Sequence, residues 1–389
     1  MKRCWETKRL GEIIQLEYGK PLSDDKRTPD GKYPVYGANG EKDRTNEFYH
    51  DKPSIIVGRK GSAGEVNLTE KRFWPLDVTY FVTFDEKKYN LKFLFNLLLT
   101  LGLPKLAKGV KPGINRNEVY GINVKAPLLP EQERIAGLID DVFEKTTKAK
   151  EIAERNLQNA RELFESYLQS VFANQGTGWE EKELGDDSII EIIDGDRGIN
   201  YPKKSDFSDA GFCLFLNTKN VRPDGFCFDE VMFVSKEKDN ALRKGKLQRN
   251  DVILTTRGTI GNLAVYDNEV PYDNVRINSG MLIFRPNTKK LLPSFLFEIL
   301  RSGIIKTQIA RHVSGAAQPQ LPIKTLVNFK IPVPRTVDVQ AKIVASLKEI
   351  GTNTKRLEVI YQQKLADLEE LKKSVLHNAF NGELAGACS

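Results

Sequence analysis

Apolar residues recur every three and four positions along two long stretches of the chain. The first stretch runs from Ile135 to Tyr167 and the second from Ile343 to Val375. A stripe kept over about five or six heptads is typical of helices that pack as a coiled coil. The predicted seam positions are Ile135, Ile139, Val142, Thr146, Ala149, Ala153, Asn156, Ala160, Leu163 and Tyr167, then Ile343, Leu347, Ile350, Thr354, Leu357, Tyr361, Lys364, Leu368, Leu371 and Val375.

The two stretches are copies of each other. Residues 131–172 align with residues 339–380 without a gap, at a constant offset of 208 residues. Pro130 opens the first stretch and Pro334 precedes the second, whereas Gly176 and Gly382 follow their ends, as is usual for helices. We predict two helices of about 60 Å, at about 1.5 Å per residue, each closing one half of a repeated chain.

The two seams differ in side-chain size. The first is small in its middle, where Ala149, Ala153 and Ala160 lie, and the second has larger residues, such as Leu357, Tyr361 and Leu368. This complementarity predicts that the two helices pair with each other in antiparallel fashion. Asn156 and Lys364 correspond in the repeat, and they either reach solvent or fix the register of the pair.

The segments between the helices have a mixed α/β pattern. Short β-branched and aromatic runs predict strands, and longer amphipathic runs predict helices. The predicted strands are residues 54–57, 78–84, 251–255 and 281–284, and the predicted helices are residues 91–101 and 293–312. The fold class is therefore α+β, with two α/β domains joined by two long helices. The expected boundaries are 1–129 and 174–334 for the domains, and 130–173 and 335–389 for the helices, the last with a C-terminal tail.

Composition favours a soluble protein without a metal centre. Hydrophobic residues make up 40% of the chain and charged residues 29%, and the longest apolar run, near Leu97–Leu99, cannot cross a bilayer. The N-terminal residues lack the apolar core of a signal peptide, so we expect a cytoplasmic protein. Four cysteines without a CxxC pair and three scattered histidines predict no metal and no cofactor.

The net charge of +7 is unevenly distributed. Residues 1–129 hold 23 Lys and Arg against 16 Asp and Glu, so most of the basic excess lies in the first α/β segment. With a sequence pI near 9.0, this distribution favours a polyanionic partner.

Three landmarks recur in order in both halves. Each half opens with a tryptophan followed by Leu-Gly, continues with a basic-Gly-Ser/Thr-x-Gly loop, and has a proline-containing loop before its long helix. These landmarks are Trp5 with Leu10-Gly11, Lys60–Gly64 and Val110–Ile114 in the first half, and Trp179 with Leu184-Gly185, Arg257–Gly261 and Ala317–Leu321 in the second. Together with the helix start Pro130–Ile135 and the helix ends 166–172 and 374–384, they resemble the specificity (S) subunit of Type I restriction–modification systems.

The resemblance implies two target-recognition domains, each reading one half of an asymmetric, interrupted site in double-stranded DNA. The coiled coil would set the spacing of the half-sites. Two methyltransferase subunits would dock on the S subunit, nuclease–translocase subunits could join them, and the S subunit itself would do no chemistry. The second helix departs from the family pattern because it lacks the Pro-x-x-Glu-Gln start, although Gln340 is kept.

The glycine-containing loops are candidate DNA contacts. Glycine lets the backbone approach a phosphate closely, and basic or hydroxyl side chains can then bond phosphate oxygens or base edges. The candidates are Arg59, Lys60 and Ser62 in the first half, and Arg257 and Thr259 in the second. The alternative is a tight turn with an incidental charge.

The loops before the long helices hold side chains of the kinds that read guanine and adenine in the major groove. They are Lys108, Lys111, Asn115 and Arg116, and Gln318 and Gln320. Lys219 is a further candidate, with Arg222, Arg276 and Asn278, although an ordinary surface would show the same residues.

Motifs for chemistry are missing from the sequence. It has no GxxxxGKS or GxxxxGKT phosphate loop and no Asn/Asp-Pro-Pro-aromatic motif of an amino-methyltransferase. We therefore expect a non-catalytic subunit. Two alternatives stay open: a coiled-coil scaffold without DNA specificity, and the recognition portion of a fused restriction–methylation enzyme.

Overall fold

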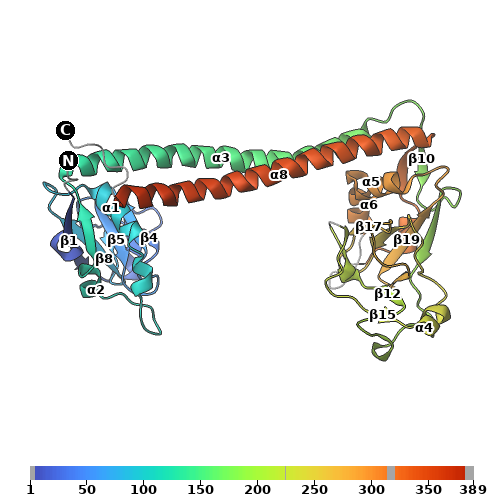
Figure 1. The fold of residues 1–389 in the computed structure, drawn as a ribbon, viewed down its shortest axis with the longest axis horizontal. Coiled ribbons are helices and arrows are strands. Elements are labelled where there is room, and N and C mark those ends of the chain that lie inside the picture. The colour runs from blue at the N-terminus through green and yellow to red at the C-terminus, as the bar shows by residue number, and fades with distance from the viewer. Residues whose placement is uncertain (1–4, 224, 313–319, 382–389) are drawn as a thin grey trace. The chain divides into compact units, whose positions relative to one another are not determined.

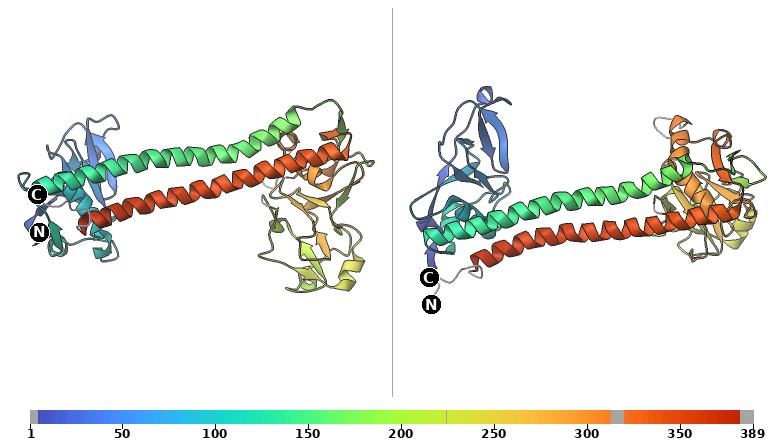
Figure 2. Two further views of the ribbon diagram at one scale, coloured as in Figure 1. Left: turned by 45° about the horizontal axis from the view of Figure 1, so that its top comes forward. Right: turned by 90° about the horizontal axis from the view of Figure 1, so that it is seen from above.

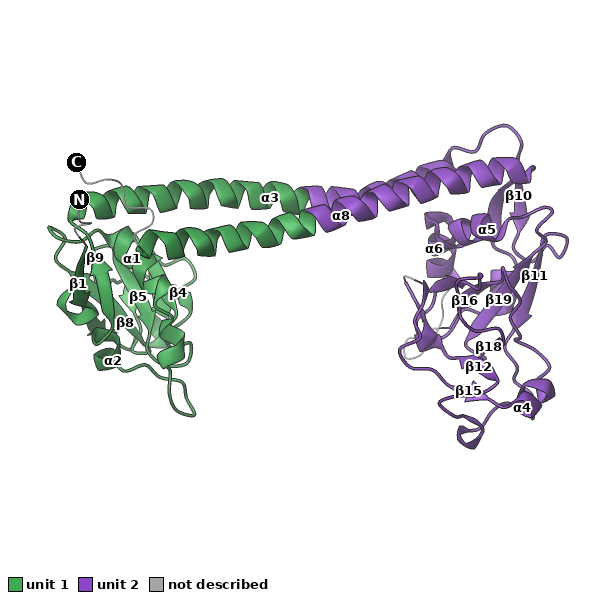
Figure 3. Cartoon of the chain, in the orientation of Figure 1, with its two compact units in different colours: residues 1–155, 361–389 green, residues 156–360 purple. Residues whose placement is uncertain are grey.

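The chain forms two compact units, each containing a part of both long helices. The computed structural model describes residues 5–223, 225–312 and 320–381 (Figure 1). Unit 1 comprises residues 1–155 and 361–389, and unit 2 comprises residues 156–360 (Figure 3). The long helices are α3, Leu129–Ala173, and α8, Val337–Phe380. The predicted α+β fold, with two domains joined by long helices, is confirmed.

Unit 1 is built on a four-stranded antiparallel sheet with the strand order β2-β8-β5-β6. These strands are Ile14–Tyr18, Thr79–Phe84, Ser54–Gly58 and Val66–Thr69. A second sheet, β4-β3-β7, contains Gly40–Thr45, Tyr33–Gly37 and Trp74–Pro75, and β1 (Glu6–Arg9) pairs with β9 (Asn123–Ala126). The helices are α1 (Leu91–Thr100) and α2 (Arg116–Tyr120), with the 3-10 turns η1 (Leu10–Glu12), η2 (Asp24–Lys26) and η3 (Leu103–Leu106).

Unit 2 repeats this architecture. Its four-stranded sheet, β11-β19-β16-β17, consists of Ile190–Asp194, Met281–Pro286, Val252–Thr255 and Leu263–Val265. Its second sheet, β15-β12-β18, consists of Phe233–Val234, Cys213–Leu216 and Val275–Ile277, and β10 (Trp179–Glu183) pairs with β20 (Lys330–Pro334). In both units the central strand of the second sheet pairs in parallel with one of its neighbours, β3 with β7 and β12 with β18. The same strand order therefore serves both halves.

Unit 2 also has elements without a counterpart in unit 1. They are the hairpin of β13 (Val221–Arg222) and β14 (Gly225–Phe226) and the helix α4 (Lys236–Ala241). The remaining elements are α5 (Pro293–Arg301), α6 (Gly303–His312), α7 (Ile323–Leu326), η4 (Lys204–Asp206) and η5 (Thr218–Asn220).

The single helix predicted for residues 293–312 is wrong, because the chain breaks it at Ser302. This residue has an extended backbone, with φ −71° and ψ 163°, and its hydroxyl donates a hydrogen bond to the carbonyl oxygen of Ile299 at 2.6 Å. A serine side chain that bonds the preceding turn competes with helix continuation. The break produces α5 and α6 as separate helices.

Each unit has its own core, which the ends of the long helices complete. In unit 1, Ile135 and Ile139 of α3 and Ala379 of α8 pack with α1 and the four-stranded sheet. In unit 2, Leu168 of α3 and Leu347 of α8 pack in the same way. The apolar stripe of a long helix therefore serves a globular core at one end and the other helix along its middle.

The two long helices pair in antiparallel fashion within each unit, as predicted (Figure 2). In unit 1 the Lys150 ammonium lies 2.8 Å from the Glu369 carboxylate, and in unit 2 Arg161 Nε lies 3.1 Å from a Glu358 carboxylate oxygen. The two residue numbers add up to 519 in both ion pairs, so the register is the same in both units.

The predicted seam fails at Leu163 and Leu357 in unit 2 and at Leu371 in unit 1, which are 52%, 37% and 44% exposed. In place of Leu163, Phe164 is turned inward, with the Arg301 guanidinium 4.5 Å from its ring centroid. The helix packs there against α5 as well as α8, so the buried stripe moves by one residue. Of the two polar seam residues, Asn156 is half-buried and Lys364 is exposed, so Lys364 reaches solvent.

The same glutamine anchors the start of both long helices. The Gln132 amide accepts a hydrogen bond from Asn90 N (2.9 Å) and donates to the carbonyl oxygens of Lys88 (3.0 Å) and Pro127 (2.8 Å). Gln340 accepts from Leu292 N (2.9 Å) and donates to Lys290 O (2.8 Å) and Pro334 O (3.1 Å). Both side chains are fully buried, so α8 docks as α3 does despite its different start.

The described helices include none long and apolar enough to cross a membrane. Within the same described ranges, no group of three or more His, Cys, Asp or Glu side chains could hold a metal ion.

Candidate nucleic-acid interface

Two loops of unit 1 that were predicted separately lie side by side in the structure. Residues 59–64 follow β5, and residues 108–115 precede α2. The main chain joins them, because Gly61 N donates to Pro112 O at 2.9 Å and Ile114 N donates to Arg59 O at 3.0 Å. Lys60 and Gly113 also form an isolated β-bridge. The structure thus brings the unit 1 candidates to one place.

The glycines of the first loop have different roles. Gly64 has a φ of +87°, and a Cβ there would lie 2.4 Å from Pro104 N, so the close packing of the loop requires glycine. Gly61 also has a positive φ, +81°, but a Cβ there would meet nothing within 4 Å. Its surroundings are open, so a ligand can approach the backbone.

The candidate side chains of unit 1 differ in how far they are already occupied. Lys108 pairs with Glu118 at 2.7 Å, and the Asn115 side chain caps α2 by accepting from Asn117 N at 2.9 Å. The other candidates are Arg59, whose Nε donates to Asp77 O at 2.9 Å, the exposed Lys60, Ser62 and Lys111, and Arg116. Among the described residues, Lys60, Lys111 and Arg116 have no ion pair to a carboxylate.

Tyr18, which sequence reasoning missed, lies between two of these candidates. It is the last residue of β2, is 47% exposed, and has the guanidinium groups of Arg59 and Arg116 at 5.4 and 5.1 Å from its ring centroid. Tyr80 packs beside it at 5.1 Å, and burial together with Tyr18 raises the pKa of Tyr80. Only the place of an aromatic residue at a strand end could have marked Tyr18 in the sequence.

Unit 2 presents the equivalent loop pair. Arg257 and Gln320 form the β-bridge that Lys60 and Gly113 form in unit 1, and Leu321 N donates to Thr256 O at 3.0 Å. Arg257, Thr259 and Gln320 are exposed, and the hydroxyl of Thr255 donates to the Thr259 carbonyl oxygen. The candidate Gln318 lies outside the described residues.

The candidate Lys219 lies near this loop pair. It belongs to η5 and is exposed, and its ammonium lies 3.9 Å from a carboxylate oxygen of Glu230. Thr218, which precedes Lys219, and Arg257 of the loop pair both lie close to Gly280. A Cβ on Gly280 would be 2.9 Å from Cγ2 of Thr218 and 3.7 Å from Cβ of Arg257. Of the weaker candidates, Arg222 is exposed, and Asn278 holds a turn by accepting from Gly280 N at 2.9 Å.

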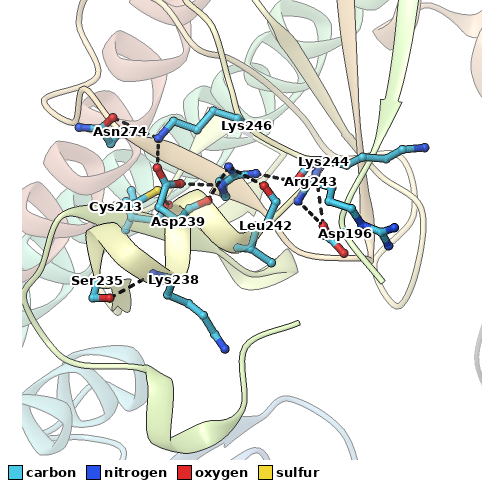
Figure 4. A network of polar contacts seen from close by, with 12 residues as sticks. Asp196, Cys213, Ser235, Lys238, Asp239, Leu242, Arg243, Lys244, Lys246 and Asn274 are labelled. Atoms are coloured by element: carbon cyan, nitrogen blue, oxygen red, sulfur yellow. Dashed lines mark hydrogen bonds and ion pairs between the residues drawn. The ribbon is translucent and has the colours of Figure 1, made fainter. Parts of the chain in front are cut away.

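The expectation that Arg276 is available to DNA is wrong. It is buried and donates to the Asp239 carboxylate at 2.5 Å. Lys246 donates to the same carboxylate at 2.6 Å (Figure 4). Burial alone would raise the pKa of Asp239, but hydrogen bonds from Lys246, Arg276 and Cys213 outweigh it and lower the pKa. Burial also raises the pKa of the Cys213 thiol to about 12. Arg276 therefore stabilises the fold.

The arrangement in unit 1 fits a polyanion. Cations without carboxylate partners gather around two joined loops, where an exposed backbone can also be approached. A ligand with regularly spaced negative charges would supply the missing partners. Protein side chains capable of base contacts, Arg116 foremost, lie among these cations.

Comparison with known proteins agrees with this assignment. The family model described as "Type I restriction modification DNA specificity domain" matches residues 2–156 and 176–367. The Type I restriction enzyme EcoBI specificity subunit of Escherichia coli is 24% identical over 368 residues, which cover 85% of this chain and 73% of that protein. The MjaVIII specificity subunit of Methanocaldococcus jannaschii is 24% identical over 411 residues, covering 98% of this chain and 93% of that protein.

Solved structures show the same fold. The HsdS subunit from Thermoanaerobacter tengcongensis matches with a TM-score of 0.65 and 19% identity, covering 98% of this chain and 97% of that chain. A chain from a structure on complex assembly and conformational transition of the type I R-M system matches with a TM-score of 0.72 and 18% identity, covering 99% of both chains.

Proposed function

From the premise that this chain belongs to the family of Type I restriction–modification DNA specificity subunits, we propose that each unit reads one half of an interrupted DNA site. The proposed contact regions are residues 59–64 with 108–116 in unit 1, and residues 257–261 with 320–321 in unit 2. Gln318, outside the described residues, stays a candidate contact. Base edges would be read by side chains of these loops, and phosphates would be held by their lysines, arginines and backbone.

The observation that carries this proposal is that the two units share a backbone architecture but carry different side chains at equivalent loop positions. The β-bridge between the two loops holds Lys60 and Gly113 in unit 1, and Arg257 and Gln320 in unit 2. Two readers of the same target would have no reason to differ at their exposed positions. The difference supports two unlike half-sites, and therefore an asymmetric site.

We further propose which segments take which part. The recognition domains are residues 1–129 and 174–334, and the helical segments 130–173 and 335–389 set the spacing between the half-sites. Two methyltransferase subunits and, in the full complex, nuclease–translocase subunits would provide the chemistry. This chain would contribute recognition alone.

A methylome tests the proposal. The chain is expressed with the methyltransferase subunit encoded beside it, and modified adenines are mapped across the host DNA. We expect one interrupted motif that disappears when this chain is omitted. An assembled, cofactor-supplied complex that methylates no motif would favour the scaffold alternative. A purified chain that modifies or cuts DNA without partners would favour the fused-enzyme alternative.

A second measurement concerns the source of affinity. Because counterions are released when lysines and arginines neutralise phosphates, the association constant of the assembled complex should fall steeply with salt. Binding that is independent of salt would contradict the phosphate contacts.

A further inference from the structure

The ring of Tyr18 is the meeting point of two cationic side chains from different segments of unit 1. Arg59 directly follows β5 and Arg116 begins α2, and both guanidinium groups lie within 5.4 Å of the ring centroid. The position of α2 is fixed against β2, because Leu16 N donates to the Tyr120 hydroxyl at 2.7 Å. Tyr18 at the end of β2 and Arg116 at the start of α2 are therefore held at a fixed distance by the contact between these two elements.

The two arginines are not equally free. Arg59 uses Nε, at 2.9 Å, and one terminal nitrogen, at 2.5 Å, to donate to Asp77 O. Arg116 makes no hydrogen bond or ion pair through its side chain among the described residues, and its contact is with the Tyr18 ring. An aromatic face orients a guanidinium without occupying its donors. Arg116 thus offers an oriented set of donors to an external acceptor.

Unit 2 lacks this cluster at the equivalent positions. Asp194 is the last residue of β11, as Tyr18 is of β2, and both are followed by a glycine at which a Cβ would collide with a carbonyl oxygen, at 2.2 and 2.1 Å. Asp194 forms an ion pair with Arg197 at 3.3 Å. Where unit 1 has Arg59 and Arg116, unit 2 has the buried Thr256 and, at the start of α7, Ile323.

We infer that Arg116, oriented by Tyr18, reads a guanine in the half-site bound by unit 1. The inference rests on the proposed function. A planar guanidinium can donate two parallel hydrogen bonds to O6 and N7 of guanine in the major groove, and no other base offers that pair of acceptors. Arg116 is the base-contacting residue and Tyr18 is a positioning residue. Arg59 contacts the same Tyr18 ring and helps to hold it in place.

A phosphate contact by Arg116 is the rival explanation, and specificity separates the two. Loss of a phosphate contact weakens binding to all sequences about equally, whereas loss of a base contact relaxes one position of the site. Lysine keeps the charge of arginine and can also donate to guanine, but it lacks the planar pair of donors, so Arg116→Lys would preserve much of a phosphate contact and weaken a guanine contact.

The experiment is a methylome and a binding assay on the assembled complex, with four variants of Arg116 and Tyr18 and with control variants of Lys111 and Arg257. For Arg116→Ala we expect the preference for guanine at one position to fall roughly 10- to 100-fold, and for Arg116→Lys to fall less at the same position, with the other half-site and the spacer unchanged. Tyr18→Ala should relax the same position, and Tyr18→Phe, which keeps the ring, should not. Lys111→Ala serves as the matched control and should weaken binding to all sites without changing the motif.

The outcomes are distinguishable from failure of the proposed function. A wild-type complex that yields no motif would defeat the proposed function itself. A wild-type motif that Arg116→Ala and Arg116→Lys leave intact, or a uniform loss of methylation that Arg116→Lys restores, would overturn the guanine contact alone. Arg257→Ala should alter only the other half-site and so assigns each half-site to its unit. Thermal unfolding of each variant shows that a lost preference is not a lost fold.

Discussion

At the residue scale, the side chain of Asp239 links α4, which has no counterpart in unit 1, to β18 of the second sheet. It lies in α4 and is 6% exposed, and it accepts hydrogen bonds from Arg276, itself 8% exposed, and from Lys246. A buried cation that loses its anion is left with a large desolvation penalty.

We predict that Asp239→Asn lowers the free energy of unfolding of unit 2 by about 3–5 kcal/mol, since it leaves Arg276 buried without a counter-charge. Hydrogen exchange read by mass spectrometry resolves the two units. Glu165→Gln is the matched control, because it breaks an exposed pair with Lys306 and should change stability by less than about 1 kcal/mol. Equal protection of unit 2 in both variants would contradict the role given to Asp239.

The pKa values of Asp239 and of a second buried carboxylate, Asp196, predict that the stability of unit 2 depends on pH. Burial raises the pKa of Asp196, but hydrogen bonds from the main-chain N–H groups of Gly198, Arg243 and Lys244 outweigh it, so its pKa is lowered, as is that of Asp239. A lowered pKa in the folded state adds stability above the unfolded-state value, about 3.9, and that stability is lost as the pH falls through the folded value. Asp251 has the opposite shift, because burial raises its pKa, and its protonation offsets part of the loss.

We therefore expect unit 2 to lose stability as the pH falls from about 5 toward the lowered pKa values of Asp239 and Asp196. Urea unfolding at a series of pH values measures this loss. The Asp239→Asn variant should show a shallower dependence, because one of the buried carboxylates with a lowered pKa is absent. An unchanged slope in that variant would mean that Asp239 does not titrate differently in the folded and unfolded states.

Residue-level prediction from the sequence found the two loops of unit 1 but not their contact. Repeated glycines mark the loops as turns, whereas the bridge between Lys60 and Gly113 joins segments about 50 residues apart that no local pattern links. Arg276 was misassigned because a sequence does not show whether an arginine faces Asp239 or solvent. Tyr18 was missed because its partners come from segments about 40 and 100 residues away, and no local pattern links them.

At the element scale, one buried glutamine anchors the start of each long helix by hydrogen bonds. Gln132 and Gln340 each make three hydrogen bonds, all to main-chain groups, at the junction of a strand, a shorter helix and the long helix. Removing the amide leaves buried donors and acceptors without partners, at a cost of about 1–3 kcal/mol for each unsatisfied group.

We predict that Gln132→Met destabilises unit 1, and Gln340→Met destabilises unit 2, by at least about 2 kcal/mol. Each change should affect the unit that contains it, which hydrogen exchange can show. Gln158→Met, at an exposed position of α3, is the control and should stay within about 0.5 kcal/mol of the wild type. A loss spread equally over both units would argue against separate seating.

The elements themselves were predictable to the extent that one period held. The long helices were found because a heptad pattern extends along them, and β5, β8, β16 and β19 because each is a short run rich in β-branched and aromatic residues. The break at Ser302 was not found, since a serine inside an amphipathic run also fits a helix. The shift from Leu163 to Phe164 was missed for a related reason: α3 exchanges one packing partner for two.

At the scale of the whole molecule, the constant register of α3 and α8 defines which segments can be removed together. Residues 148–154 face residues 365–371 in the pairing seen for Lys150 with Glu369. Removing both shortens each helix by one heptad and keeps the sequence on either side in register.

We predict that this double deletion shortens the spacer of the methylated motif by up to about three base pairs, since seven residues span about 10 Å of helix and one base pair about 3.4 Å of DNA. Both half-sites should stay the same. Deleting residues 148–154 alone breaks the register and should abolish methylation, which provides the control. A changed half-site in the double deletion would contradict the division of labour between helices and recognition domains.

The contacts of Gln132 and Gln340 have a consequence for how such chains can diversify. Every acceptor and donor that they use belongs to the main chain, and the main chain offers these groups whatever side chains it carries. A recombination event that imports a foreign recognition segment therefore need not bring a matching partner residue with it. Selection can act on the exposed loops while the hydrogen bonds of the glutamine remain possible with each imported segment. New specificities can therefore arise by exchange of gene segments.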